Sequence, residues 1–196
     1  MRTFWYVAYA EVVFCCWVLG TFGAVSLARA SRRRRSAGPD AERGTRSPKA
    51  LWGLALEVAA FVVVLLFRRK SGGFAEGPLL VAAMLFAPAA AAVFVSAALH
   101  LGKQMRLQAV VSEAHELVTT GPYSVVRHPI YASIFLLLLS NICLFARWWA
   151  APAAVTLYIL GTEIRVRVED RLLASRFGQR FESYRGRVAA YIPGVR

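Results

Sequence analysis

Long runs of hydrophobic residues, separated by short polar segments, dominate the pattern of this chain. A helix needs about 20 apolar residues to cross roughly 30 Å of hydrocarbon. Three runs are of this kind: Phe4–Leu27, Leu51–Phe67 and Pro78–Leu101. A fourth stretch, Ile130–Ile164, is long enough for two shorter spans. We place the break between them near Arg147, because a charge followed by two tryptophans is typical of a turn at the lipid headgroups. The pattern therefore predicts five transmembrane helices.

The pattern becomes amphipathic from Gly161 onward, where Ile164, Val168 and Leu172 recur at helical spacing with charged residues between them. We expect this helix to leave the membrane and to end near Gly178, since glycine is a common residue just after a helix. The predicted fold class is all-α: a polytopic membrane helix bundle with a C-terminal cytoplasmic amphipathic helix.

Composition supports a membrane protein rather than a water-soluble globule. Of the 196 residues, 58% are hydrophobic, and 24 basic residues stand against 11 acidic ones. A nucleic-acid-binding module would spread its basic residues over a polar folded surface, whereas here the arginines form blocks between apolar runs. We therefore expect membrane lipids, and no nucleic acid, as the partners of these charges. The three cysteines lie in apolar stretches and indicate no disulfide framework.

The basic blocks also predict an orientation, because short cytoplasmic loops are rich in Lys and Arg. The loop over residues 29–50 is strongly basic, so it is expected in the cytoplasm after a retained first span. Five crossings then place Gly102–Pro129 and the segment after Ile164 on the same side. Only Arg68–Lys70 disagree with this scheme, since they would face outward.

The most informative stretch is GPYSVVRHPIY, residues 121–131, which lies between a polar segment and an apolar span. A residue before proline is held in extended geometry, and this applies to both Gly121 and His128. Pro129 suits the first turn of the helix that follows. We predict a stiff loop at a helix start that presents four side chains at the membrane surface: Tyr123, Arg127, His128 and Tyr131. The alternative interpretation is an ordinary interfacial belt that anchors in the headgroups.

A second polar cluster follows the last predicted span, where Arg165, Glu169 and Asp170 lie close together in sequence. Adjacent carboxylates flanked by arginines are unusual near lipid. They could instead form a simple ladder of helical ion pairs, because Arg165–Glu169 and Glu163–Arg167 both have i,i+4 spacing. Spacing alone leaves both interpretations open.

Together the two clusters resemble a family. From about Leu101 to the C-terminus, HELVTTGPYSVVRHPIYAS and then EIRVRVEDRLLASRFGQRFESYRGRVAAYIP are similar to the isoprenylcysteine carboxyl methyltransferases, integral membrane enzymes related to phospholipid methyltransferases. The family usually carries two adjacent glutamates where this chain has Glu169 and Asp170. The resemblance implies a division into N-terminal transmembrane helices with a basic cytoplasmic loop, 1–100, and a methyltransferase catalytic region, 101–196.

The resemblance further implies S-adenosylmethionine as methyl donor, bound from the cytoplasmic side, and a lipophilic or amphiphilic acceptor that enters from the bilayer. His128 and Tyr131 would line the cofactor pocket with Glu169 and Asp170, and the turn residues Gly121, Pro122 and Tyr123 would lie nearby. Arg127 and Arg165 would orient the acceptor's polar head or the donor's carboxylate.

The chemistry needs neither a metal nor a covalent intermediate, and no His and Cys set has metal-ligand spacing. A carboxylate acceptor needs no general base, whereas a hydroxyl or amine would need one, for which His128 is the candidate. Two glutamates, Glu11 and Glu57, lie inside predicted spans, where a charged carboxylate is energetically costly and therefore suggests a function. Glu57 is the better candidate for the acceptor path, and Glu11 the weaker one. Tyr184 and Tyr191 are left out of the predicted site.

The predicted function is methyl transfer from S-adenosylmethionine to a carboxylate, hydroxyl or thiol on a lipid-like acceptor, at an active site that faces the cytoplasm. Two alternatives remain open on the sequence. One is a phospholipid or amine N-methyltransferase. The other is a non-catalytic membrane scaffold or transporter with the same fold.

Overall fold

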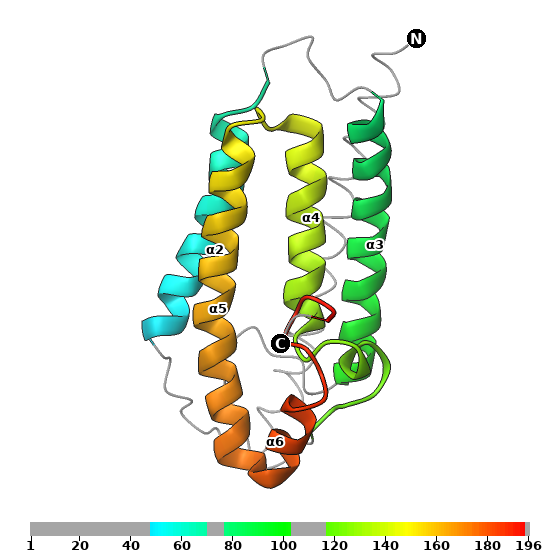
Figure 1. Cartoon of the computed structure of the whole chain (residues 1–196), viewed down its shortest axis with the longest axis vertical. Coiled ribbons are helices and arrows are strands. Elements are labelled where there is room, and N and C mark those ends of the chain that lie inside the picture. Colours follow the sequence, from blue (N-terminus) through cyan, green and yellow to red (C-terminus); the bar gives the residue numbers. More distant parts are fainter. Residues whose placement is uncertain (1–47, 70–76, 103–116, 195–196) are drawn as a thin grey trace, which may run out of the picture.

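The computed structural model describes residues 48–69, 77–102 and 117–194. The predicted span Phe4–Leu27, with Glu11, and most of the basic loop lie outside the described residues. Four of the described helices are long, and each runs antiparallel to the one before it (Figure 1). They are α2 (Pro48–Leu66), α3 (Pro78–Leu101), α4 (Pro129–Phe145) and α5 (Ala150–Phe177). The 3-10 turn η2 (Gly121–Ser124) and the short helix α6 (Gln179–Arg185) lie at one end of the bundle.

The helix limits follow the hydrophobic pattern closely. Helix α3 has the predicted limits, and α2 begins at Pro48 rather than Leu51. The stretch after Ile130 is divided where predicted, between Phe145 and Ala150. Helix α5 continues through Gly161 without a break and ends at Phe177, where the left-handed φ of 51° at Gly178 terminates it and the Gly178 N–H donates to Ala174 O at 2.9 Å.

Two of these helices, α2 and α3, are long and apolar enough to cross a bilayer, and α4 is apolar but shorter. Only 22% and 17% of the apolar windows of α2 and α3 are buried, which distinguishes them from core helices of a soluble protein. Large side chains such as Trp52 and Leu99 point outward, with 71% and 72% of their surface exposed. Extended apolar surface of this kind suits lipid. The full five-span arrangement, with its cytoplasmic C-terminal helix, stays a prediction.

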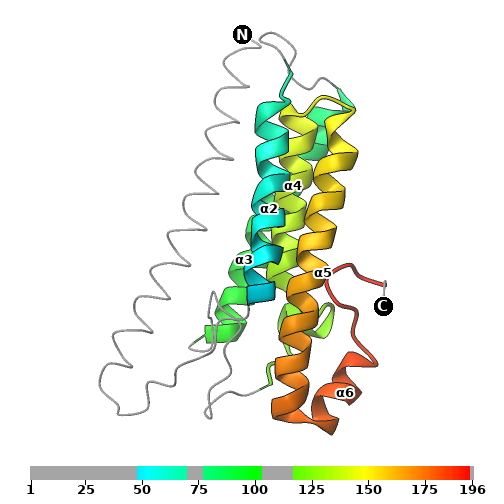
Figure 2. The ribbon, with the colours of Figure 1, turned by 90° about the vertical axis from the view of Figure 1, so that its left-hand side faces the viewer.

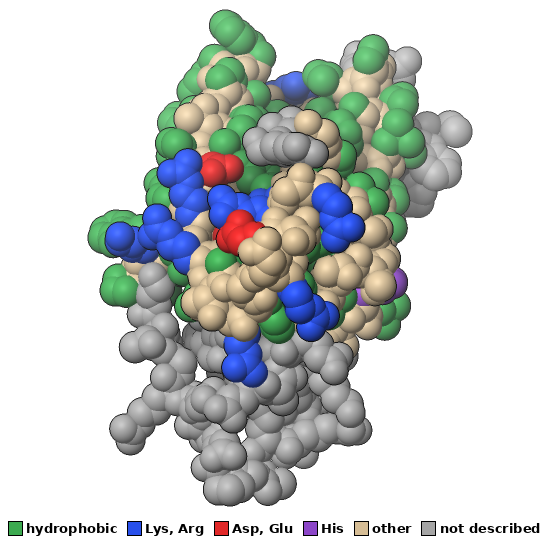
Figure 3. Space-filling model, turned by 60° about the horizontal axis from the view of Figure 1, so that its bottom comes forward, with side chains coloured by type: hydrophobic (Ala, Val, Ile, Leu, Met, Phe, Trp, Pro, Cys, Tyr) green, Lys and Arg blue, Asp and Glu red, His purple; other side chains and the backbone are tan. Residues whose placement is uncertain are grey.

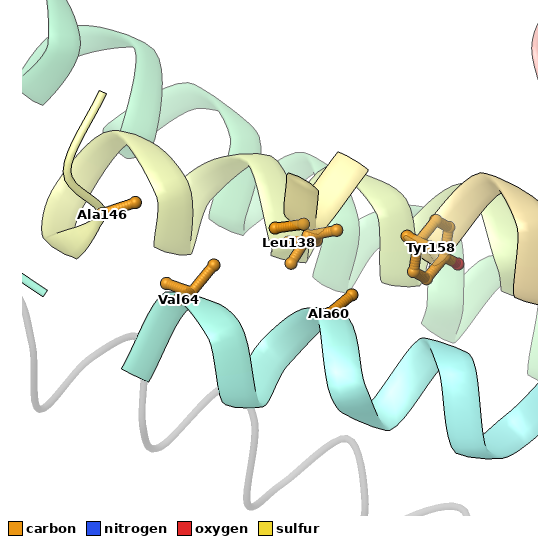
Figure 4. Close-up of a cluster of buried hydrophobic side chains, with 6 residues drawn as sticks. Ala60, Val64, Leu138, Ala146 and Tyr158 are labelled. Carbon is orange, nitrogen blue, oxygen red and sulfur yellow. The ribbon is translucent and has the colours of Figure 1, made fainter. Parts of the chain in front are cut away.

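The bundle is built from two close helix pairs, α2 with α5 and α3 with α4 (Figures 1 and 2). A buried cluster at its centre joins α2, α4 and α5 (Figure 4). Its members are Ala60, Val64, Leu138, Ala146, Ala154 and Tyr158. Between α3 and α4, small residues such as Ala83 and Ala87 allow close packing, and Ser140 Oγ donates to the Ala83 carbonyl at 3.1 Å.

Helices α2 and α5 meet through two glycines. A Cβ atom added to Gly161 would lie 2.5 Å from the carbonyl oxygen of Gly53, and one added to Gly53 would lie 2.7 Å from that of Gly161. No side chain larger than hydrogen fits at either position without separating the two backbones. The contact therefore fixes α2 against the middle of α5.

At the end of the bundle away from α6, the end of α2 is bonded to the α4–α5 turn. The Arg69 N–H donates to Phe145 O at 2.8 Å, and the Arg147 N–H donates to Phe67 O at 3.0 Å. The Arg69 side chain also donates through Nε to Ala146 O at 3.0 Å. Arg69, which disagreed with the orientation inferred from charge, therefore has a structural role in joining these segments.

Candidate functional site

The start of α4 and the end of α5, which carry the polar residues of the site, lie at the same end of the bundle (Figure 1). The turn that leads into α4 starts with Gly121 at a left-handed φ of 60°, so the extended geometry predicted for this residue is wrong; glycine has no Cβ and can adopt this conformation before a proline. This backbone conformation favours glycine, and a Cβ atom there would lie 2.2 Å from the exposed ring of His100 at the end of α3, which would have to turn aside. Pro129 occupies the first turn of α4, as predicted.

The C-terminal segment runs alongside this turn and pairs with it. The Arg127 N–H donates to Ala189 O and the His128 N–H donates to Ala190 O, each at 2.8 Å. The Arg127 guanidinium donates to the Val188 carbonyl, and the Tyr184 hydroxyl donates to Tyr123 O at 2.5 Å. These bonds satisfy the backbone of the turn and hold the side chains of Arg127 and His128 toward α5.

The adjacent carboxylates of α5 meet these two side chains. Asp170 lies 2.9 Å from His128 Nε2 through Oδ1 and 3.0 Å from Arg127 Nη2 through Oδ2. Glu169 lies 3.3 Å from the other ring nitrogen of His128 and accepts a hydrogen bond from the Tyr131 hydroxyl. Thus the predicted turn and the predicted acidic pair, 42 positions apart between His128 and Asp170, form one cluster.

The charges within this cluster shift its pKa values. Burial alone would lower the pKa of His128, but the hydrogen bonds and negative charges of Asp170 and Glu169 raise it to about 9. Burial alone would raise the pKa of both acids, yet His128, with Tyr131 for Glu169 and Arg127 for Asp170, keeps both below their ordinary values. At neutral pH the cluster therefore contains an imidazolium between two carboxylates.

Arg165 does not form the ion pair with Glu169 that the ladder interpretation would require. Its Nη1 donates to Glu57 Oε2 on α2 at 2.6 Å, and its guanidinium carbon lies 4.7 Å from the centre of the Tyr131 ring. The other pair of that interpretation, Glu163 with Arg167, is present on the exposed side of α5 at 3.4 Å. The ladder interpretation is therefore wrong for Arg165.

Other predicted site residues lie beside the cluster without joining it. Within the described ranges, no hydrogen bond or ion pair connects Gly121, Pro122 or Tyr123 to the acidic pair. Sequence reasoning left out Tyr184 and Tyr191, which are both buried and both anchor the end of the chain: Tyr191 donates to Glu163 at 3.1 Å. Their position next to apolar residues could have indicated that these tyrosines are buried. The sequence gives no sign of their hydrogen-bond partners, which are a backbone carbonyl and a distant carboxylate.

A groove of about 420 Å³ opens beside Asp170, between α5 and α6. Seen from this end of the molecule, basic side chains surround the acidic ones (Figure 3). The groove is lined by Arg167, Asp170, Arg171, Ala174, Glu182 and Arg185. Three arginines against two acids make it suitable for an anionic group.

Residues 80–175 match the model of the isoprenylcysteine carboxyl methyltransferase (ICMT) family. This segment of the chain belongs to this family. The ICMT family is a family of methyltransferases, and together with the two apolar helices it makes this chain a membrane protein. The matched segment contains the turn, α4, nearly all of α5 and most of α3, whereas α2 and α6 lie outside it.

A curated relative gives less information than the family model. The nickel-cobalt-cadmium resistance protein NccN of Alcaligenes xylosoxydans xylosoxydans is 35% identical over 78 residues. That alignment covers 40% of this chain and 36% of NccN, so the chain spans about a third of the length of the relative it matches.

Proposed function

We propose that this chain is an integral membrane methyltransferase that transfers a methyl group from S-adenosylmethionine to a lipophilic or amphiphilic acceptor, at an active site that faces the cytoplasm. The observation that carries this proposal is the meeting of Arg127 and His128 with Glu169 and Asp170 at one end of an apolar bundle. Membership of a methyltransferase family supports it independently.

The residues of the cluster fit the methyl donor. The Nε atom of Arg127 is buried and has no hydrogen-bond partner among the described residues, and an unsatisfied buried donor is costly. A ligand carboxylate would satisfy it. Glu169 keeps 27% of its side chain exposed, so its carboxylate can accept a hydrogen bond from a hydroxyl or amino group of the donor. His128 and Tyr131 would form the wall between these two positions.

The donor supplies a methyl group that its positive sulfur already activates, so the chain has to align the reactants and exclude water. The buried aromatic and backbone contacts around Tyr131 and Tyr158 restrict movement on the bilayer side of the cluster, since the Tyr158 hydroxyl donates to the Tyr131 carbonyl at 2.7 Å. Glu169 and Asp170 would also favour a cation beside them.

The state of His128 favours a carboxylate as acceptor. Both of its ring nitrogens face carboxylate oxygens, at 2.9 and 3.3 Å, so both have to donate protons. A histidine in this state has no free lone pair with which to remove a proton from a hydroxyl or an amine. A carboxylate is ionised already and needs no base.

The arginine groove favours a second candidate, a phospholipid N-methyltransferase, because a phosphate headgroup would suit Arg167, Arg171 and Arg185. The two reactions differ in their products. A methyl ester releases methanol on mild treatment with base, whereas an N-methyl group does not.

The experiment uses membranes that contain the full chain, incubated with S-adenosylmethionine that carries tritium in its methyl group. We expect label in the extracted lipid and its release by base. Glu169→Gln should abolish the labelling. Glu163→Gln, the same change on the exposed side of α5, should leave it, because glutamine keeps an oxygen that accepts from Tyr191. Calorimetry with S-adenosylhomocysteine distinguishes the enzyme from a non-catalytic scaffold. The proposal is contradicted if no binding is detected at about millimolar ligand, which means a binding free energy weaker than about −4 kcal/mol.

A further inference from the structure

A buried carboxylate lies within the apolar helix α2, outside the part of the chain that the family model matches. Glu57 is only 4% exposed, although an isolated carboxylate is expensive in such surroundings. Both of its oxygens have partners on α5: Oε2 accepts from Arg165 at 2.6 Å and Oε1 accepts from Thr162 Oγ1 at 3.1 Å. The carboxylate therefore belongs to an interhelical contact rather than to the packing of α2 alone.

The glycine contact determines where this carboxylate points. Gly161 has its Cα so close to α2 that an added Cβ would lie 3.0 Å from the Glu57 backbone nitrogen and 3.1 Å from its Cγ. Gly53, one turn earlier on α2, touches the same backbone of α5. With the two backbones fixed at this spacing, the side chain of Glu57 reaches Arg165, one turn further along α5.

Arg165 lies at the border of the proposed site. Its guanidinium covers the ring of Tyr131, whose hydroxyl donates to Glu169. Only this ring therefore separates Arg165 from the carboxylate proposed to bind the methyl donor. Its side chain is 16% exposed, and among the described residues its hydrogen bonds use Nη1 alone. Its remaining N–H groups have no hydrogen-bond partner in the described part of the chain, so they can receive an anion.

A partly buried arginine beside apolar helices needs partners that hold its side chain in place. A long cationic side chain next to lipid extends toward the headgroups when nothing holds it. Glu57 supplies the opposite charge, and Tyr131 supplies a ring face to which a guanidinium is attracted. Loss of the carboxylate would free the guanidinium from the position over Tyr131.

We propose that Glu57 is a positioning residue, which holds Arg165 over Tyr131 so that the guanidinium can bind the anionic head of the acceptor. Helix α2 then completes the acceptor side of the site, while Arg127 serves the donor side. This inference rests on the proposed methyltransferase function.

The test separates donor binding from acceptor use. Glu57→Gln, Arg165→Gln and the double variant are titrated with S-adenosylhomocysteine by calorimetry. Their initial rates are then measured with a total lipid extract of the producing cells as acceptor. Each rate is divided by the amount of protein that binds S-adenosylhomocysteine in the calorimeter. We expect Glu57→Gln to raise the acceptor KM about tenfold or more and to leave the donor Kd within about twofold. The double variant should resemble Arg165→Gln alone, since both changes remove one interaction. Glu57→Asp should restore part of the loss.

Ser140→Ala is the matched control, because it removes a buried interhelical hydrogen bond on the other helix pair. It should lower stability and leave the acceptor KM unchanged. If Glu57→Gln does not fold, Thr162→Val decides, since it removes only the second bond to the same carboxylate and should raise the acceptor KM about two- to threefold.

Three results would overturn the inference. The acceptor KM could be unchanged in the variant that folds, Glu57→Asp could fail to restore any of the acceptor use lost in Glu57→Gln, or the only effect could be weaker binding of the donor. Failure of the proposed function has a different signature, because it shows in the unaltered chain. A wild-type protein that neither binds S-adenosylhomocysteine nor labels any lipid refutes both.

Discussion

Replacing Asp170 with asparagine tests the central contact of the site. The aspartate accepts from His128 at 2.9 Å and from Arg127 at 3.0 Å, and Arg185 lies 3.9 Å away. Asparagine keeps one acceptor oxygen but turns an NH₂ group toward a guanidinium or an imidazolium. A donor then faces a donor, and the side chains of Arg127, His128 and residue 170 are only 7–8% exposed.

The structure gives the size of the effect. Removal of one partner from a buried ion pair costs about 3–5 kcal/mol, because the other charge is left uncompensated. A chain of this length loses about 2–4 °C in Tm for each kcal/mol, so Asp170→Asn should lower the Tm by about 6–20 °C. Such a loss is a large part of a typical total stability of about 5–15 kcal/mol.

The pH dependence gives a second, independent reading. Because the folded pKa of His128 is raised from 6.5 to about 9, its charged form stabilises the fold fully below pH 6.5. That contribution is lost as the pH rises through about 9. Asp170→Asn removes one of the two carboxylates that raise this pKa, so the variant should lose less stability than the wild type over this pH window.

The measurement is thermal unfolding of detergent-solubilised protein, followed by circular dichroism at about pH 6 and about pH 9.5, on either side of the window. Glu182→Gln, an exposed carboxylate on α6, is the control and should melt like the wild type. The reasoning is refuted if Asp170→Asn melts within about 2 °C of the wild type, which is less than about 1 kcal/mol, and shows an unaltered pH dependence.

Two further predictions concern the backbone. Gly161→Val should lower the Tm by an amount equivalent to about 1–3 kcal/mol, because its Cβ would lie 2.5 Å from the Gly53 carbonyl, which cannot move aside as a side chain can. Gly186→Val, with its nearest contact at an ordinary 3.5 Å, should be tolerated in the same melting experiment, and equal losses would argue against the close helix approach. Deletion of residues 189–196 removes the carbonyl that receives the His128 N–H, so affinity for S-adenosylhomocysteine should fall about tenfold or more by calorimetry; an unchanged Kd would contradict it.

The helices and the turn could be predicted because their signals are local. An uninterrupted apolar run gave the limits of α3, and a charge with two tryptophans marked the break before α5. Likewise Gly178 ends α5 because glycine adopts the left-handed conformation without strain. Each of these features depends on residues that are neighbours in the sequence.

The pairing of distant segments could not be predicted in the same way. Glu57 and Arg165 are 108 positions apart, and hydropathy does not tell which helices of a bundle are neighbours. A carboxylate in a span did signal the need for a partner, without naming it. The pairing of Ala189 and Ala190 with the turn had no signal at all, because it uses backbone carbonyls that every residue has.

The glycine contact between α2 and α5 has a consequence for engineering. Residues 80–175 carry the family signature, yet the face of α5 that bears Gly161 and Arg165 is completed by a helix outside that segment. A fragment that begins at residue 77 would therefore lack the helix that packs on this face of α5. Chimeras between relatives should exchange α2 and α5 together, and a separately produced α2 peptide should restore such a fragment in trans.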